Sequence, residues 1–456
     1  MYNSIKLSCP ECNSYLTLTE AKTKYVCSNG CEYPIANGIP RFVTRENYAS
    51  SFGLQWNLFR RTQLDSFTGT SISRDRLKGL VGGSLDIFRG KTVLEAGCGA
   101  GRFTEVMLAA GANVFAVDIS TAVEANYLTC CNYQDYFVCQ ADILNLPIQP
   151  EQFDIVVCAG VIQHTPSPEE TISRLCAHVK PGGLLVIDHY TYTYPITRSR
   201  RTLRSILLKR SSIFSMKFCK LLVAGLWPVH ILIYALRFLP KMTSIRHAFL
   251  RLSPVVDYQG DHPQLGKRLL YQWALLDTHD TLTDYYKHIR TVSQIYDDLC
   301  ESKMVDIDAV YGGNGVEAMA RKPSPRESRD LGVSTSGNYQ DQHTGIGWPT
   351  QHLKGPFKHI RGYAWLAELG QYRQVADCPE NPLQSVVFLY ENGVNVGPGH
   401  SSHLDIIARG QGRYSHWGDG IIFSTSDHSD PNTNGRTYSI RLRYKPLPLQ
   451  GRRETL

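Results

Sequence analysis

Apolar and polar residues follow two different spacings in the middle of the chain. Short runs of consecutive apolar residues alternate with segments in which apolar residues recur every three or four positions. The first kind is typical of buried parallel strands, and the second is typical of helices with one buried face. The expected strands cover 91–97, 113–118, 136–142, 153–160, 184–190, 305–313 and 315–323, and the expected helices cover 102–111, 121–130, 169–179 and 292–304. This alternation predicts an α/β protein with a doubly wound sheet.

The pattern changes on both sides of this predicted sheet and once within it. A cysteine-rich start with short β-like runs precedes a polar helical segment, and a basic, mostly helical insert interrupts the sheet at 195–288. Near the C-terminus, a stretch rich in Ser, Gly, Pro and charged residues is followed by short strands broken by Gly, Asn and Asp. The predicted division is a small domain at 1–43, a helical connector at 44–89, the sheet domain at 90–322, a linker at 323–345 and an all-β module at 346–448.

Composition and charge narrow the class of protein. The 456 residues are 42% hydrophobic, which is enough apolar surface for several folded domains and excludes a disordered chain. The formal net charge is +7, but twelve Lys and Arg and no Asp or Glu lie between His189 and Val256. The rest of the chain is therefore net negative. Charge confined to one segment favours a local anionic partner and argues against nucleic acid as the partner.

The basic insert also contains the longest uncharged apolar run, Leu221 to Leu236. Its 16 residues include a proline and a histidine and fall short of the roughly 20 that a membrane span needs. The N-terminus lacks the order of a secretory signal, so we expect a cytoplasmic protein. Residues 198–251 are expected to form a lid, and its apolar and basic side chains suit peripheral contact with an anionic membrane at its inner face. An ordinary lid packed on the sheet is the alternative.

Four cysteines near the N-terminus have the spacing of a metal site. Cys9 and Cys12 form one pair, and Cys27 and Cys31 form a second pair after fourteen intervening residues. Four thiolates complete a tetrahedral zinc site and leave no open position for catalysis, so the predicted zinc is structural. A domain of about forty residues has too small a hydrophobic core to fold without such a metal site. The continuation from Glu32 to Phe42 resembles the zinc ribbon of the methyltransferase-activator family, which implies a methyltransferase as neighbour or partner.

A glycine-rich loop follows the first expected strand of the sheet. Gly97, Gly99 and Gly101 stand where backbone must approach a ligand closely, before an expected helix. In a nicotinamide-binding loop the third glycine would come one residue later, where Arg102 stands, so a dehydrogenase is the less favoured alternative. Asp118 ends the next strand, where a carboxylate can accept hydrogen bonds from a ribose.

The loop and the acidic residues that end the following strands resemble the class I S-adenosylmethionine (SAM)-dependent methyltransferases across about 90–322. The resemblance implies a Rossmann-like sheet in which the glycines line the methionine end of SAM and Glu95 holds its amino group. It further implies that Asp118 binds the ribose, that Asp142 lies at the adenine edge and that Gly160 backs the methyl donor. The cofactor-binding residues expected in this way are Glu95, Gly97, Gly99, Gly101, Asp118, Ile119, Asp142, Ile143 and Gly160.

Candidate acceptor-binding residues lie at the same edge of the sheet. His164 follows the fourth strand and is the best-placed general base, although local packing is the alternative. Asp277, His279 and Asp280 form a dense polar cluster in an otherwise apolar helix, which suggests acceptor binding or else a solvated turn. The Asn-Pro-Pro-Tyr type of motif is absent after the fourth strand, so an oxygen or carbon acceptor is favoured over nitrogen.

The C-terminal module is dense in aromatic and polar residues, which is the composition of a sugar-binding groove. It resembles the tails of bacterial polysaccharide- and sugar-modifying enzymes. A metal site and plain turn chemistry are the alternatives, the metal ligands being His400, His403, Asp405 and His416.

Three functional hypotheses follow from these features. The first is SAM-dependent O-methylation of a sugar in a glycan or in a nucleotide- or lipid-linked saccharide. The second is methylation of a prenylated quinone or another lipid or small-molecule acceptor, and the third is a non-catalytic scaffold. The expected cofactors are SAM and a structural zinc ion, and the expected partner is a saccharide or lipid-linked acceptor.

Overall fold

The computed structural model describes residues 5–44, 47–192, 194, 197–327, 350–370, 372–378 and 385–442. The predicted linker therefore lies outside the described residues from residue 328 onward. The chain divides into two compact units. The first comprises Met1–Leu77, Asp86–Gly183 and Thr193–His288, and the second comprises Lys78–Leu85, Leu184–Tyr192 and Ile289–Leu456.

A seven-stranded sheet has the strand order β10-β11-β9-β8-β5-β6-β7. The neighbours β8, β5, β6 and β7 pair in parallel, whereas β11 is antiparallel to both β9 and β10. The strands are β5 Thr92–Ala96, β6 Asn113–Asp118, β7 Tyr136–Gln140, β8 Phe153–Cys158, β9 Val179–His189, β10 Val305–Gly312 and β11 Gly315–Arg321. The predicted Rossmann-like sheet is confirmed, with one reversed strand that the doubly wound pattern did not include.

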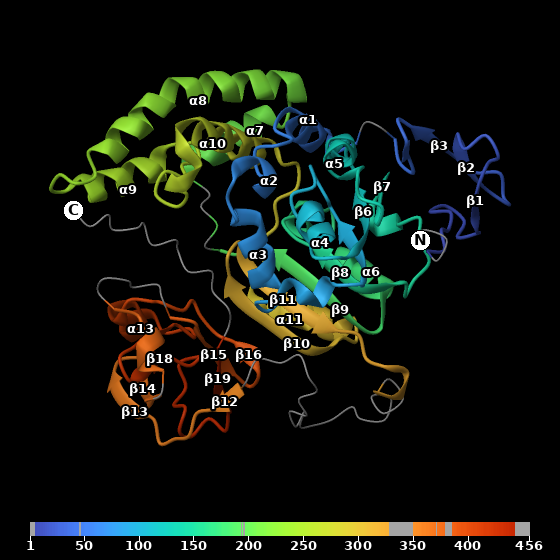
Figure 1. The fold of residues 1–456 in the computed structure, drawn as a ribbon. Helices are drawn as coiled ribbons and strands as arrows, with labels where there is room; N and C mark the ends of the chain where they lie inside the picture. Colours follow the sequence, from blue (N-terminus) through green and yellow to red (C-terminus); the bar gives the residue numbers. More distant parts are fainter. Residues whose placement is uncertain are drawn as a thin grey trace. The chain divides into compact units, whose positions relative to one another are not determined.

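The helices that follow the parallel strands lie where the apolar spacing predicts them (Figure 1). They are α4 Thr104–Ala109, α5 Ala122–Cys130 and α6 Pro168–His178, while α11 Val292–Glu301 precedes β10. Ser167 caps the N-terminus of α6 by accepting the Glu170 amide, as expected for a Ser-Pro helix start. The strands between these helices are almost wholly buried, because helices cover both faces of a parallel sheet.

The N-terminal residues form a separate four-stranded sheet in the order β1-β2-β3-β4. Its strands are β1 Leu16–Leu18, β2 Lys24–Cys27, β3 Glu32–Ala36 and β4 Ile39–Pro40. The chain then pairs with the edge of the large sheet, where the amide of Phe42 donates to the carbonyl of Gln140 (2.8 Å). Arg41 adds an ion pair to Glu124 (3.1 Å). The ribbon therefore covers the C-terminal end of the edge strand β7 at Gln140.

The segment predicted as a connector forms α1 Ser50–Leu58, α2 Asp65–Thr68, α3 Ile72–Leu80 and the 3₁₀ turn η2 Leu85–Phe88. Helix α1 packs on α5, since a Cβ on Gly53 would lie 2.3 Å from Oγ1 of Thr121. Only glycine allows this approach. The first helix of the connector is thus packed against the sheet domain.

The basic insert is helical, in four helices of the first unit: α7 Arg198–Leu207, α8 Ser212–Ala235, α9 Met242–Leu252 and α10 Gly266–Thr283. A buried apolar cluster joins α7, α8 and α10 through Leu207, Val223, Trp227 and Trp273. Helix α8 has 24 residues and is long and apolar enough to cross a membrane by length and composition, which for one helix is weak evidence. The apolar run counted from the sequence is shorter than α8, because the helix begins before the run and includes charged residues at its N-terminal end.

The C-terminal residues form two four-stranded antiparallel sheets around an aromatic core that includes Phe357, Phe423 and Tyr438. The first sheet contains β12 Thr350–His352, β19 Tyr438–Leu442, β15 Val387–Glu391 and β16 Val394–Asn395, and the second contains β13 Lys358–Arg361, β14 Ala364–Glu368, β18 Gly420–Phe423 and β17 Tyr414–Trp417. The predicted β module is confirmed, and its described residues also include the short helix α13 His403–Arg409, which the sequence pattern did not predict. Ser402 starts this helix by accepting the amide of Asp405.

Candidate functional site

The glycine-rich loop turns sharply between β5 and α4. Gly97, Gly99 and Gly101 have φ of +82°, +51° and +96°, the left-handed region in which side chains are strained. A Cβ on Gly97 would lie 2.3 Å from Cγ2 of Val161, so the loop also packs too tightly for any side chain there. The glycines expected from the sequence are therefore required by the backbone itself.

Asp118 at the end of β6 is tied to this loop. Its carboxylate accepts the Gly99 amide at 3.0 Å, and it accepts the amide and the hydroxyl of Ser120 at 2.8 and 2.7 Å. Burial raises its pKa above the usual value, opposed by these hydrogen bonds. A carboxylate offers about four acceptor positions, so one position remains for a ligand hydroxyl.

Glu95, the last acidic residue before the loop, is the centre of a buried polar network. The hydroxyl of Thr104 donates to its carboxylate, and the amide of Asn126 donates to Thr104 Oγ1 at 2.9 Å. Tyr136 in turn donates to Asn126 at 2.7 Å. Burial raises the pKa of Glu95 to about 8, so the side chain is largely protonated at neutral pH. The sequence predicted Glu95 but not the supporting residues, whose spacing gives no signal.

The expected adenine side of the site lies after β7. Asp142 accepts the amide of Leu144 at 2.9 Å and so caps the 3₁₀ turn Ile143–Asn145. The carbonyl of Ile119 accepts the side-chain amides of Asn47 and Gln140 at 2.7 and 2.9 Å. Tyr48 lies near both Asp118 and Asp142. Burial raises the pKa of its hydroxyl, and the charges of these two carboxylates raise it further. Residues before α1 therefore line this edge, which the sequence analysis did not anticipate.

Helix α1 covers the loop from the other side. The indole of Trp56 lies 3.5 Å from the position that a Cβ on Gly99 would occupy. The ring of Phe52 lies 5.2 Å from the ring of His164, and Gln55 Oε1 is 2.7 Å from Nδ1 of His279. This position beside the loop makes Trp56 a candidate wall of the cofactor site.

His164 is held at the end of the 3₁₀ turn η4 Ile162–His164, just after β8. Its Nδ1 lies 3.1 Å from the carbonyl of Tyr286 and 3.5 Å from Asp284 Oδ2. Because a carbonyl can only accept, Nδ1 carries a proton and Nε2 is the basic nitrogen of the neutral ring. Asp284 is fully buried and also pairs with Lys287 (3.0 Å) and Arg204 (2.7 Å).

The three polar residues predicted on α10 lie in different surroundings. A carboxylate oxygen of Asp280 lies within 4.8 Å of a ring nitrogen of His164 and of a carboxylate oxygen of Asp284. The structure therefore places Asp280 beside the candidate base. Asp277 instead accepts the hydroxyl of Tyr258 at 2.5 Å, and burial raises its pKa to about 7. His279 is fully buried against Gln55, and burial lowers its pKa to about 4.

Two arginines that the sequence analysis did not select lie beside the loop. Nη2 of Arg76 is 3.8 Å from the position that a Cβ on Gly160 would occupy. The guanidinium groups of Arg76 and Arg102 both lie over the ring of Phe103, at 5.5 and 5.0 Å from its centroid. Burial, and then the charge of Arg76, lowers the pKa of Arg102 to about 10. Two cations at this position suit an anionic group of a ligand.

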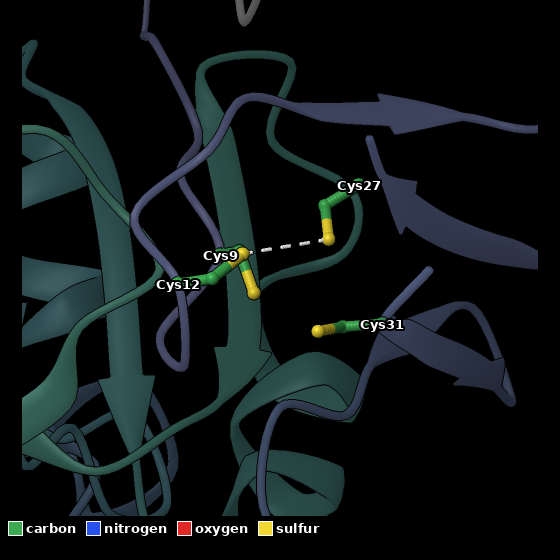
Figure 2. Close-up of side chains that lie close together, drawn as sticks. All are labelled: Cys9, Cys12, Cys27 and Cys31. Carbon is green, nitrogen blue, oxygen red and sulfur yellow. Dashed lines mark hydrogen bonds between the residues drawn. The ribbon is translucent and has the colours of Figure 1, made fainter. Parts of the chain in front are cut away.

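The four N-terminal cysteines converge in space (Figure 2). Their sulfur atoms lie within 4.8 Å of one another, and Sγ of Cys12 and Cys27 are 3.7 Å apart. A tetrahedral zinc ion with Zn–S bonds of about 2.3 Å separates its sulfurs by about 3.8 Å, so the donor set fits this ion. Cys9 and Cys12 also contact the hydroxyls of Tyr33 (3.1 Å) and Ser14 (2.8 Å).

The C-terminal module does not bring its four candidate metal ligands together. His400 pairs with Asp377 at 2.7 Å, and the buried His416 pairs with Ser385 at 2.8 Å. His403 packs on Trp417, and the carboxylate of Asp405 accepts the hydroxyl of Ser402, the N-cap of the same helix. In the part of the chain that the structure describes, these four side chains form no metal-binding group, and the metal alternative is wrong there.

Comparison with known proteins agrees with this geometry. Residues 94–187 match the family model described as a methyltransferase domain. The ubiquinone biosynthesis O-methyltransferase of Coxiella burnetii is 36% identical over 100 residues, which are 21% of this chain and 42% of that protein. The protein of the same name from Shewanella pealeana is 25% identical over 222 residues, covering 45% of this chain and 75% of that protein. A solved structure of phosphoethanolamine N-methyltransferase 1 from Haemonchus contortus is 20% identical, with a TM-score of 0.27, covering 34% of this chain and 35% of that chain.

Residues 94–187 are thus a methyltransferase domain, and their fold is that of the class I SAM-dependent methyltransferases. The chain covers less than half, 42%, of the length of the first curated relatives that it matches.

Proposed function

We propose that this protein transfers the methyl group of SAM to an oxygen atom of a small-molecule acceptor. The observation that carries the proposal is the strained glycine loop with the Asp118 carboxylate bound to the Gly99 amide. It supports a cofactor with a ribose at the ends of two neighbouring parallel strands. Arg76 beside Gly160 is suited to the carboxylate of the methionine part, and Glu95 is suited to its ammonium group.

The protein has two chemical tasks in this reaction. SAM supplies an electrophilic methyl group when bound, and the protein has to align the acceptor oxygen and remove its proton. We assign proton removal to Nε2 of His164. Asp284 and the carbonyl of Tyr286 hold the opposite nitrogen and stabilise the imidazolium that forms. We assign the orientation of the acceptor hydroxyl to Asp280, whose carboxylate lies within 4.8 Å of a ring nitrogen of His164.

Titration with SAM tests the cofactor assignment. Because Glu95 has a pKa of about 8 when buried beside Thr104, it is mostly protonated at pH 7, and a bound ammonium group favours its ionised form. SAM binding should therefore release close to one proton at pH 7, and affinity should rise with pH up to about 8. Calorimetry in two buffers of different ionisation enthalpy measures this release.

The Glu95→Gln variant should bind SAM more weakly and release no proton, and Asp118→Ala should bind SAM at least about tenfold more weakly. The exposed Leu128→Ser variant is the control and should match the unchanged protein. Binding of NAD with no response to SAM would contradict the assignment, and no response to either ligand would favour the scaffold hypothesis.

For the acceptor we propose a phenolic hydroxyl on a lipid-linked ring. The choice is supported by curated relatives, matched over part of their length, that are named ubiquinone biosynthesis O-methyltransferases. Supplying labelled SAM with a prenylated catechol, the same ring without its chain and an oligosaccharide compares the hypotheses. We expect label on the catechols, with the prenylated one favoured, whereas label on the oligosaccharide alone would overturn this choice.

Methylation of a saccharide is the second candidate. The observation that favours it is a cavity of about 480 Å³ in the C-terminal module, lined by His352, Phe357, Asn432, Arg436 and Tyr438 among others. Much of its polar capacity is already used, because Asn432 bonds the backbone of Phe357 and Arg436 pairs with two carboxylates. We therefore rank this candidate below the phenolic acceptor.

We further propose that Cys9, Cys12, Cys27 and Cys31 hold a structural zinc ion. Four cysteine ligands leave no position for a substrate, so this ion would stabilise the ribbon and take no part in methyl transfer.

A further inference from the structure

The outward face of α8 is apolar and uncovered in the described structure. Leu221 is 76% exposed and Leu232 57%, and small or apolar residues lie between them on the same face. Beyond the helix, Phe238 is 81% exposed and Leu252 at the end of α9 is 73% exposed. Single exposed leucines are common in folded proteins, but several strongly exposed apolar side chains along one helix, in the turn after it and at the end of the next helix indicate an interaction surface. We call this set the α8–α9 surface.

Basic residues flank the α8–α9 surface. Lys217, one turn before Leu221, and Lys220, directly before it, are exposed, and Arg237 and Lys241 follow the C-terminal end of α8. No Asp or Glu occurs from residue 190 to 256. An apolar face with cations at its rim and no carboxylate is complementary to a bilayer that contains anionic lipid, and an acidic protein groove would not need so wide an apolar face.

The opposite face of α8 is anchored in the protein. Cys219, Val223 and Trp227 are buried in the cluster shared with α10. His230 is fully buried and contacts Asp257 Oδ2 at 3.2 Å and Ser253 Oγ at 2.9 Å, and this contact to His230 lowers the pKa of Asp257 against the effect of burial. A helix that crossed a bilayer would have to break these contacts and place a carboxylate partner in hydrocarbon. The helix is therefore suited to lie on a membrane with one face inserted.

We propose that the α8–α9 surface binds the surface of an anionic lipid bilayer, with the axis of α8 in the plane of the interface. The apolar side chains enter the acyl boundary, and the flanking Lys and Arg contact lipid phosphates. The proposal does not depend on methyl transfer, because it concerns the outer side of the insert and is measured by binding alone.

Sedimentation with vesicles tests this proposal on the full chain. We expect binding to vesicles of phosphatidylcholine with 30% phosphatidylglycerol, weaker binding as salt rises, and at least about tenfold weaker binding to phosphatidylcholine alone. The Leu221→Ser/Leu232→Ser variant should lose at least about tenfold in affinity because it removes two inserted side chains. The Lys217→Glu/Lys220→Glu variant should bind more weakly and lose part of its salt dependence. Leu128→Ser, an equally exposed leucine on α5, is the matched control and should bind as the unchanged protein does.

Three results would overturn the proposal. The first is equal binding by the leucine variant and the control. The second is resistance to alkaline extraction from membranes, which would indicate a spanning helix. The third is a dimer in solution that the leucine substitutions dissociate, which would mean that a second copy of the chain covers this surface. Circular dichroism and thermal unfolding of each variant exclude loss of fold as the cause.

Discussion

The His164→Ala variant should turn over about 10²–10⁴-fold more slowly than the unchanged protein while binding SAM normally. The imidazole is the basic group that the structure holds just after β8, and Asp284 with the carbonyl of Tyr286 fixes its proton on Nδ1. Without it, the acceptor hydroxyl has to lose its proton to water, so the chemical step slows and the cofactor affinity does not change. Single-turnover transfer of labelled methyl separates the chemical step from binding and product release.

Two variants make this result specific. His247→Ala removes an exposed histidine on α9 and should retain full activity. Asp284→Asn keeps the shape of the side chain but removes the negative charge beside His164, so single-turnover transfer should slow while the affinity for SAM stays unchanged. Near-normal single-turnover transfer by His164→Ala would contradict the assignment of the base.

Loss of the N-terminal zinc should have the largest effect on stability. Structural zinc binding to peptides of this kind is worth about 10–16 kcal/mol at neutral pH, and the ribbon has few other buried residues, chiefly Tyr33, Ile39 and Phe42. The Cys12→Ser/Cys27→Ser variant should therefore contain no zinc and should unfold over the ribbon. Metal analysis of the purified protein, with about one zinc per chain expected, and hydrogen exchange over residues 5–44 measure both effects.

The consequence should extend to the edge of the large sheet. Phe42 and Arg41 pair with β7, so an unfolded ribbon leaves that edge uncovered and prone to aggregation. Cys131→Ser, which removes an exposed cysteine outside the cluster, is the control and should keep its zinc and its stability. A double variant that retains zinc, or a metal-free protein whose ribbon exchanges as slowly as before, would contradict the structural role.

The sequence by itself was sufficient to predict the features that depend on residues close together along the chain. The alternation of buried runs and amphipathic segments predicted β5 to β8 and the helices between them, because period and burial are local properties of a strand or a helix. The cysteine spacing predicted the ribbon. The loop glycines were recognisable because a left-handed turn restricts the residue type at the position itself.

Features that depend on distant parts of the chain needed the tertiary structure. Tyr48, Phe52 and Trp56 contact residues some 40 to 240 positions away, so their roles carry no local signal and the segment was expected to be a connector. The polar residues of α10 are close in sequence, but the helix places only Asp280 beside His164, while His279 is buried on Gln55. Only the packing of α8 on α10 decided which face of α8 is buried, because from Leu221 onward apolar residues lie on every side of α8 and no period marks one face.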